Sequence, residues 1–238
     1  MKLFYDSTTN KYKANSRLLE SVPNVFKRGS LIDTDGVLSG FSSANYAVIP
    51  YEFSPGTNTW EIVIKIKGNS FSASGQTLFI GLYNLENDLS DAGLAIGCNK
   101  NSRYHYVTFT LKDTQSSYKI APTVDGLTTT SSSTNTNYWF KYTFNGTSYR
   151  LSRSTDGSTF TSLKAVPYSS KYLSSYYKYF VLGVTYDSTS SNYIALDGSI
   201  DLAECYIKIN GGLWWSGIKD DIEYKGFKSY EKGQYYGN

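Results

Sequence analysis

Apolar and polar residues alternate along most of the chain from residue 36 onward, and this alternation predicts β-strands. In residues 59–67 the apolar side chains fall on one face and the charged ones on the other, namely Trp60, Ile62, Ile64 and Ile66 against Glu61, Lys65 and Lys67. Side chains of a strand point alternately to its two faces, so this segment has one dry side and one wet side. Residues 103–112 alternate in the same way and place His105 on the apolar face with Val107, Phe109 and Leu111.

Further short segments have the same strand pattern, and turn dipeptides separate several of them. The segments are 37–42, 45–50, 77–83, 93–97, 138–144, 148–154 and 179–186. Asn145-Gly146, Asp156-Gly157 and Asn210-Gly211 are typical of tight hairpin turns, which join antiparallel neighbours. Many short strands without helical periods between them predict an all-β fold, a two-sheet antiparallel jelly-roll sandwich.

The alternation changes phase once, near the C-terminal end of the strand region. Ile200 and Leu202 share one parity, whereas Cys205, Ile207 and Ile209 share the other. An extra residue in a strand shifts the face of everything that follows it. We therefore predict a β-bulge near Ala203-Glu204, which would keep one buried face.

The two ends of the chain differ from this pattern. Residues 1–35 contain a short helix-compatible stretch at 16–20, then Pro23 and a basic Lys27-Arg28 step, and we interpret them as an N-terminal arm or docking segment. Residues 36–217 form the predicted sandwich and residues 218–238 a C-terminal tail. Three polar stretches, 125–137, 167–178 and 187–193, are predicted loops and are too short for interdomain linkers.

Composition narrows the class of protein. Hydrophobic residues make up 40% of the chain and charged residues 18%, which is typical of a globular protein. The net charge of +3 comes from scattered Lys and Arg without a basic run, so we expect no nucleic-acid partner. No apolar stretch is long enough for a membrane span or resembles a signal peptide, so we expect no membrane partner.

Cysteine and histidine are too few to suggest a zinc site. Cys98 and Cys205 lie far apart in sequence, and His105 is the single histidine. Two buried thiols are the favoured interpretation of the cysteines, and one disulfide between distant strands is the alternative.

Two parts of the sequence resemble a known family. Residues 137–160, with Trp139, Asn145-Gly146 and Asp156-Gly157, resemble the central hairpin of laminin-G and concanavalin A-like domains. Residues 36–67 and 198–217 together resemble the opening and closing strands of concanavalin A-like domains in bacteriophage tail, fibre and other virion proteins. The resemblance implies glycan recognition and virion attachment or decoration, and it implies that Trp214 and Trp215 plug one end of the sandwich.

The residues needed for catalysis on this fold are missing. Retaining glycoside hydrolases need two carboxylates about 5 Å apart, and Asp201 and Glu204 come closest, although their odd spacing puts them on opposite strand faces unless the bulge intervenes. A serine triad would have to use His105, and no nucleophile elbow or phosphate-binding loop is present. We therefore expect the protein not to be an enzyme.

Glycan binding needs aromatic faces flanked by amide and carboxylate groups. Aromatic and polar residues gather in two predicted loops, and the candidates there are Tyr172, Tyr176, Tyr177, Asp187, Asn192 and Tyr193. Tyr104, Tyr106 and Trp139 are an alternative set, as an exposed patch on one sheet face. Each tyrosine is equally compatible with an ordinary position on a tyrosine-rich surface. No cofactor is required; calcium is possible, with Asp88, Asp91, Asp187 and Asp197 as loop candidates that otherwise cap turns.

The favoured hypothesis is a non-enzymatic phage virion protein that binds bacterial surface glycans. Residues 1–35 would attach it to other virion proteins or to sister subunits in a homo-oligomer, after assembly in the host cytoplasm. The alternative is a purely structural capsid or tail decoration protein, and a polysaccharide-cleaving hydrolase ranks below both.

Overall fold

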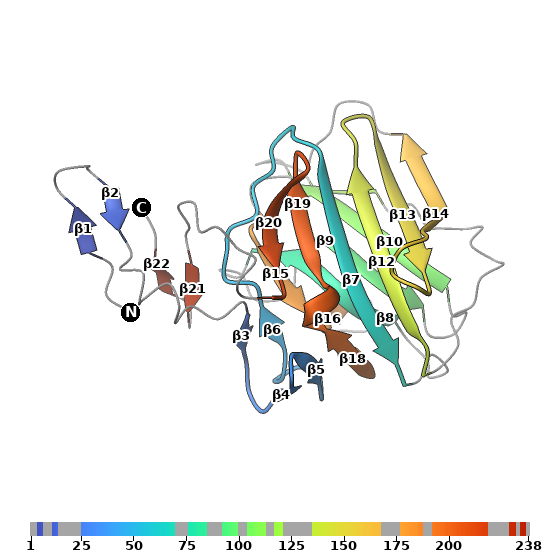
Figure 1. Cartoon of the computed structure of the whole chain (residues 1–238), viewed down its shortest axis with the longest axis horizontal. Coiled ribbons are helices and arrows are strands. Elements are labelled where there is room, and N and C mark those ends of the chain that lie inside the picture. Colours follow the sequence, from blue (N-terminus) through green and yellow to red (C-terminus); the bar gives the residue numbers. More distant parts are fainter. Residues whose placement is uncertain are drawn as a thin grey trace.

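The structure is a computed structural model that describes residues 4–6, 11–13, 25–69, 76–84, 92–99, 104–112, 117–120, 135–167, 177–187, 192–218, 229–231 and 234–236. Two antiparallel sheets face each other as a sandwich, so the predicted all-β architecture is confirmed (Figure 1). In Figure 1, β7, β12 and β13 of one sheet run in front of β8, β9 and β10 of the other.

The smaller sheet has seven strands. In spatial order these are β11 (Ser117–Ile120), β10 (Tyr104–Lys112), β9 (Ala92–Asn99), β8 (Gln76–Tyr83), β15 (Tyr179–Leu182), β6 (Ala47–Val48) and β3 (Phe26–Lys27).

The larger sheet has nine strands. Seven of them follow the order β14 (Thr161–Pro167), β13 (Ser148–Ser154), β12 (Asn137–Phe144), β7 (Trp60–Gly68), β18 (Gly198–Asp201), β5 (Val37–Ser39) and β4 (Ile32–Thr34). The other two are β19 (Tyr206–Ile209), which also pairs with β7, and β20 (Gly212–Ser216), which pairs with β19.

Three strand pairs stand apart from these sheets, namely β1 (Phe4–Asp6) with β2 (Lys11–Lys13), β16 (Val184–Asp187) with β17 (Asn192–Ala195), and β21 (Ser229–Glu231) with β22 (Gln234–Tyr236).

The core between the sheets is built from the apolar parity of each strand. The four apolar residues predicted for the dry face of β7 are all buried, and so is every second residue of β12, which gives Trp60, Ile62, Ile64, Ile66, Tyr138, Phe140, Tyr142 and Phe144. Burying one such side chain contributes roughly 1.5–3 kcal/mol. Trp215 is also in this core, and the Trp214 ring packs edge-on to Phe53 with centroids 5.2 Å apart. Both tryptophans therefore pack in or against the core, and their plugging of one end stays a prediction.

The phase change in residues 198–210 is produced by a single helical turn. β18 and β19 both pair along one edge of β7, and the 3-10 turn η2 (Leu202–Glu204) separates them. At the gap the Lys65 backbone N–H donates to the Cys205 sulfur (3.4 Å), and that thiol donates to the Asp201 carbonyl (3.0 Å). The predicted β-bulge is thus a 3-10 turn instead, and it has the expected result that Leu202 and Cys205 are both buried.

The sandwich begins before residue 36, so the expected boundary there is wrong. β3 pairs with β6 in one sheet and β4 pairs with β5 in the other. Val25 and Leu31 lie in the core cluster, because each belongs to a segment that the sheets hold in place. Residues 25–35 are therefore part of the sandwich. The helix-compatible stretch at 16–20 lies outside the described residues.

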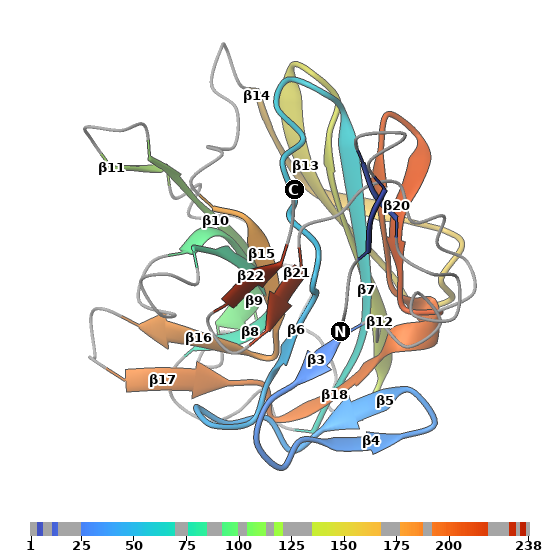
Figure 2. The same cartoon turned by 90° about the vertical axis from the view of Figure 1, so that its left-hand side faces the viewer.

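The β16–β17 hairpin folds against the outer side of the seven-stranded sheet (Figure 2). A second apolar cluster holds it there, made by Tyr83, Tyr179 and Val181 of the sheet with Val184 and Ala195 of the hairpin. The Tyr83 hydroxyl donates to the Val184 carbonyl (3.4 Å). This packing positions the segment that follows β17.

The structure also bears on the cysteines and on membrane-spanning segments. Cys205 is a free, buried thiol, so the disulfide alternative is wrong, and burial raises the pKa of this thiol to about 12. Within the described residues, no helix is long and apolar enough to cross a membrane.

Candidate functional site

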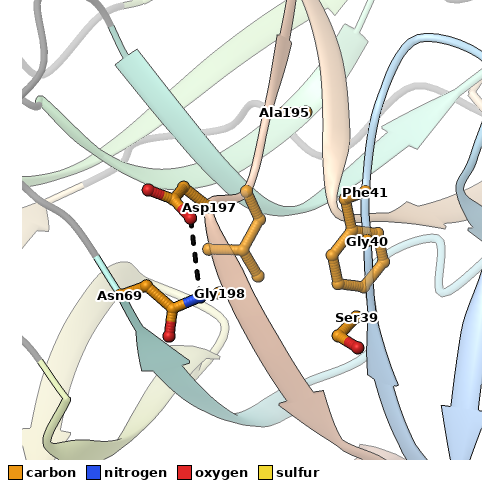
Figure 3. Close-up of a pocket in the computed structure, with 8 residues that line it drawn as sticks. Ser39, Gly40, Phe41, Asn69, Ala195, Asp197 and Gly198 are labelled. Atoms are coloured by element: carbon orange, nitrogen blue, oxygen red, sulfur yellow. Dashed lines mark hydrogen bonds between the residues drawn. The ribbon is translucent and has the colours of Figure 1, made fainter.

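A pocket of about 550 Å³ opens where the C-terminal ends of β5 and β7 meet the β17–β18 turn (Figure 3). It is lined by Ser39, Gly40, Phe41, Asn69, Ala195, Leu196, Asp197 and Gly198, and we call it the Asp197 pocket. Three segments that are distant in sequence meet here because β5, β18 and β7 are neighbours in the large sheet.

Two glycines allow the walls of the Asp197 pocket to come together. Gly183 has a φ of +83°, and a Cβ there would overlap the Phe41 ring. Gly198 lies so close to β7 that a Cβ there would overlap the Lys67 carbonyl. Only glycine combines a left-handed backbone with such close approach at low cost. The result is that Phe41, a 9% exposed member of the main core cluster, also lines the pocket (Figure 3).

The polar rim joins a carboxylate to an amide. The Asn69 backbone N–H donates to the Asp197 carbonyl (2.9 Å), which fixes the two residues side by side. Their side chains are more loosely paired, with 3.5 Å between Asn69 Nδ2 and Asp197 Oδ1, longer than the usual 2.7–3.2 Å of such a bond (Figure 3). Both residues are exposed. The carboxylate therefore keeps most of its capacity to accept hydrogen bonds from a ligand.

Carboxylate, amide and hydroxyl groups next to an aromatic ring suit a polyhydroxylated ligand. A sugar hydroxyl both donates and accepts, so it can donate to Asp197 while it accepts from the Asn69 amide. The apolar C–H face of the sugar needs an apolar partner, and Phe41 contributes only the small part of its surface that is exposed. The pocket is a wide, open depression whose lining includes one carboxylate, one side-chain amide and one hydroxyl, from Asp197, Asn69 and Ser39.

Two of the predicted glycan-site arrangements are wrong. Tyr177 is fully buried in the main core, since residues 177–182 lead directly into the central part of the seven-stranded sheet. Tyr104 and Tyr106 lie in β10 of that sheet, whereas Trp139 lies in β12 of the other, so the three cannot form a patch on one sheet face.

Trp139 does lie on the outer face of its sheet, but neighbours contact its ring. The Lys65 ammonium is 4.8 Å from the ring centroid, and a Cβ at Gly157 would lie 3.0 Å from the indole Cε2. The indole therefore packs against the loop that follows β13 and is not an open stacking platform.

Three other candidates come together in one hairpin. Asp187 pairs with Asn192 across β16 and β17, and Tyr193 occupies the next pair with Tyr186. Tyr193 is 40% exposed. Since a strand rises about 3.3 Å per residue, Asn192 stands about 10 Å from the pocket residue Ala195. Asp187 and Asn192 thus lie at the tip of the hairpin, away from the Asp197 pocket. Tyr172 and Tyr176 lie outside the described residues.

The sequence missed most of the pocket. Ser39, Phe41 and Asn69 lie in or just after strands and resemble ordinary strand ends, and the sequence indicates Asp197 only as a candidate calcium ligand. Its position in an Asp-Gly pair between two predicted strands is the one local signal that marks it as a loop residue. Within the described residues, no three His, Cys, Asp or Glu side chains are close enough to hold a metal ion.

Asp201 and Glu204, the carboxylates closest to a catalytic pair, both approach Lys65. The η2 turn replaces the expected strand alternation, so the two no longer lie on opposite faces. Lys65 Nζ is 2.8 Å from Asp201 Oδ2 and 3.9 Å from Glu204 Oε1. Asp201 also caps η2 by accepting from the Ala203 N–H (3.2 Å). This arrangement stabilises the turn.

No protein-family model matches the sequence, and no curated protein is similar to it at a significant level. A crystal structure of a tryptophan-to-alanine mutant of HCR/D matches with a TM-score of 0.50 and 11% identity, over 83% of this chain and 44% of that one. The chain thus spans less than half of that protein.

Two further solved structures match with lower TM-scores. Domain 4 of AbnA, a GH43 extracellular arabinanase from Geobacillus stearothermophilus, in complex with arabinotriose, has a TM-score of 0.47 and 10% identity, over 83% of this chain and 84% of that one. The exoplasmic/lumenal domain of VIP36 in its metal-free form has a TM-score of 0.46 and 13% identity, over 76% and 84%. At such low identity a structural likeness concerns the fold alone.

Proposed function

We propose that the chain is a non-enzymatic glycan-binding module and that its sugar site is the Asp197 pocket. The observation that carries this proposal is the Asn69–Asp197 pair, held by its backbone at the mouth of a cavity with an aromatic wall. A hydrogen bond to a charged group contributes about 1.5–3 kcal/mol, whereas a millimolar dissociation constant corresponds to about 4 kcal/mol, so Asp197 orients a sugar and further contacts must complete the binding.

Binding without turnover fits the same residues. Cleavage of a glycosidic bond needs two carboxyl groups on either side of the bond. Of the eight described residues that line the Asp197 pocket, Asp197 alone carries a carboxylate. One carboxylate can orient a sugar but cannot also supply the second group of the hydrolytic pair.

The test compares the binding of two Asp-to-Asn variants to arrays of bacterial surface polysaccharides. Asp197→Asn removes the charge at the pocket and should weaken binding about tenfold or more, because 1.4 kcal/mol is a factor of ten. Asp35→Asn makes the same chemical change in the exposed β4–β5 turn, where asparagine tolerates the positive φ of 53°, and should leave binding unchanged. Equal binding by both variants would place the site elsewhere.

A calcium contribution is tested on the same arrays. Adding a chelator should leave glycan binding unchanged if Asp197 acts through direct hydrogen bonds, and should abolish it if a cation lies between. The second result would return Asp187 and Asp197 to the role of metal ligands.

We further propose that the module is carried on a phage particle, with residues before the sandwich as its attachment to other virion proteins. The support is the resemblance of residues 36–67 and 198–217 to virion domains. Protein mass spectrometry of purified particles, with and without proteolytic trimming of the N-terminal segment, tests both parts. A chain that binds particles but no glycan would favour the decoration role instead.

A further inference from the structure

Four polar residues continue from the Asp197 pocket in a straight row across the large sheet. Ser39 of β5 pairs with Ser199 of β18, Ser199 pairs with Lys67 of β7, and Lys67 pairs with Asn137 of β12. We call these four residues the polar row.

The polar row lies on the outer face of the sandwich. Neighbouring residues in each strand point the other way, and those neighbours, Leu38, Ile200, Ile66 and Tyr138, are all buried in the core. Lys67 and Asn137 are exposed, while Ser39 and Ser199 are half-buried. Within the described residues, the row is therefore open to a ligand at Lys67 and Asn137 and partly covered at Ser39 and Ser199.

The row is long enough for several sugar units. Paired strands lie about 4.8 Å apart, so its three steps extend about 14 Å from Ser39 to Asn137. Because Ser39 also lines the Asp197 pocket, a ligand can leave the pocket directly onto the row. Hydroxyl, amide and ammonium groups along it can each bond to hydroxyls or anionic groups.

Lys67 gives the polar row an unneutralised positive charge. Lys65, on the same face of the same strand, is paired with Asp201 at 2.8 Å. Lys67, in contrast, has no carboxylate within 4.0 Å in the described part of the chain. The pocket itself carries the opposite charge through Asp197. Asn69, which is bonded to Asp197 through the backbone, lies two residues after Lys67, or about 7 Å along the strand.

From this separation of charge we propose that the ligand is an acidic oligosaccharide that places an uncharged sugar in the Asp197 pocket and an anionic group of an adjoining unit on Lys67. The inference rests on the proposed glycan site. Asp197 repels an anion from the pocket, and Lys67 attracts one to the row. A uronate carboxylate and a sugar phosphate have the same charge and suit the ammonium equally, since lysine acts as a point charge.

The test uses an array that carries uronate-containing, phosphate-containing and neutral oligosaccharides of equal length. Wild-type protein should bind the acidic members about two- to fivefold more tightly than the neutral ones, the effect of one exposed ion pair. Lys67→Gln should abolish this preference and keep the neutral binding. Lys141→Gln, the same change on the same sheet face but outside the row, should retain it. Added salt should reduce the preference in wild type.

The outcomes separate the inference from the proposed function. A preference limited to the uronate or to the phosphate members identifies the anion. If Lys67→Gln keeps the wild-type preference, or if wild type favours neutral glycans, the acidic-ligand inference is wrong while the Asp197 pocket stands. If Asp197→Asn binds the array like wild type, the assignment of the glycan site to the Asp197 pocket is wrong, and so is the acidic-ligand inference that rests on it. Both are also wrong if the wild-type protein binds no member of the array.

Discussion

The contact between Gly183 and Phe41 gives the most direct test of how the Asp197 pocket is built. Gly183→Ala places a Cβ on a backbone with φ +83° and pushes it into the Phe41 ring. The left-handed conformation costs an alanine about 1–2 kcal/mol. Overpacking of a core adds about 1–3 kcal/mol. We therefore expect Gly183→Ala to lower the free energy of unfolding by about 2–5 kcal/mol.

Gly146 provides the matched control. It has a similar φ of +94°, but a Cβ there would meet nothing within 4 Å. Gly146→Ala should therefore cost only the backbone part, about 1–2 kcal/mol. The difference between the two variants measures the overlap with Phe41.

Guanidinium unfolding followed by circular dichroism measures both values, and a third variant isolates the ring. In a Phe41→Ala background the cost of Gly183→Ala should fall toward that of Gly146→Ala, because all the ring atoms that the new Cβ would strike are gone. Gly183→Ala should also weaken glycan binding by displacing the pocket wall. If the two glycine variants lose the same stability, the described packing of Phe41 is wrong.

Two further predictions concern single side chains. The Thr159 N–H, the Ser154 hydroxyl and the Ser158 N–H donate to Asp156 and lower the pKa of its carboxyl from the usual 3.8. The carboxylate therefore stabilises the loop above pH 3.8, and this stabilisation is lost as the pH falls below that value. The difference in unfolding free energy between wild type and Asp156→Ala should vanish in acid, and a difference that stays constant with pH would contradict this. Cys205 is buried and its thiol pKa is raised, so both access and thiolate formation are limited in the folded protein. In a Cys98→Ser variant a thiol reagent should label Cys205 only after unfolding. Fast labelling of the native variant would show instead that the thiol is accessible.

The strand pattern was predictable because each strand has one buried and one exposed face. The alternation in residues 59–67 reflects these two faces, and the four predicted residues of β7 are buried; Val63, on the other face beside β19, is buried as well. The break near Ala203 was also visible, since a change of phase must appear in the sequence. Its form was not, because a 3-10 turn and a bulge shift the phase in the same way.

Errors arose where burial depends on distant partners. Residues 25–35 have little alternation of their own, yet β3 and β4 are held by β6 and β5. Tyr177 looked like a loop tyrosine because polar residues precede it, but the strand it enters is central. The Asp197 pocket is the strongest case. The pairing of β5 with β18 and of β18 with β7 brings its segments together, and the register of these long-range pairs cannot be predicted from the local sequence pattern.

The position of β7 has a consequence for how the chain acquires its fold. Both edges of this strand are covered by partners that come much later in the sequence, and the bond from Lys65 to Cys205 spans 140 residues. Long-range pairing of this kind slows folding, because a large loop must close before the contacts that stabilise it exist. During synthesis, β7 has an open edge until residue 209 has emerged. Shortened chains that end before β19 should aggregate through that edge.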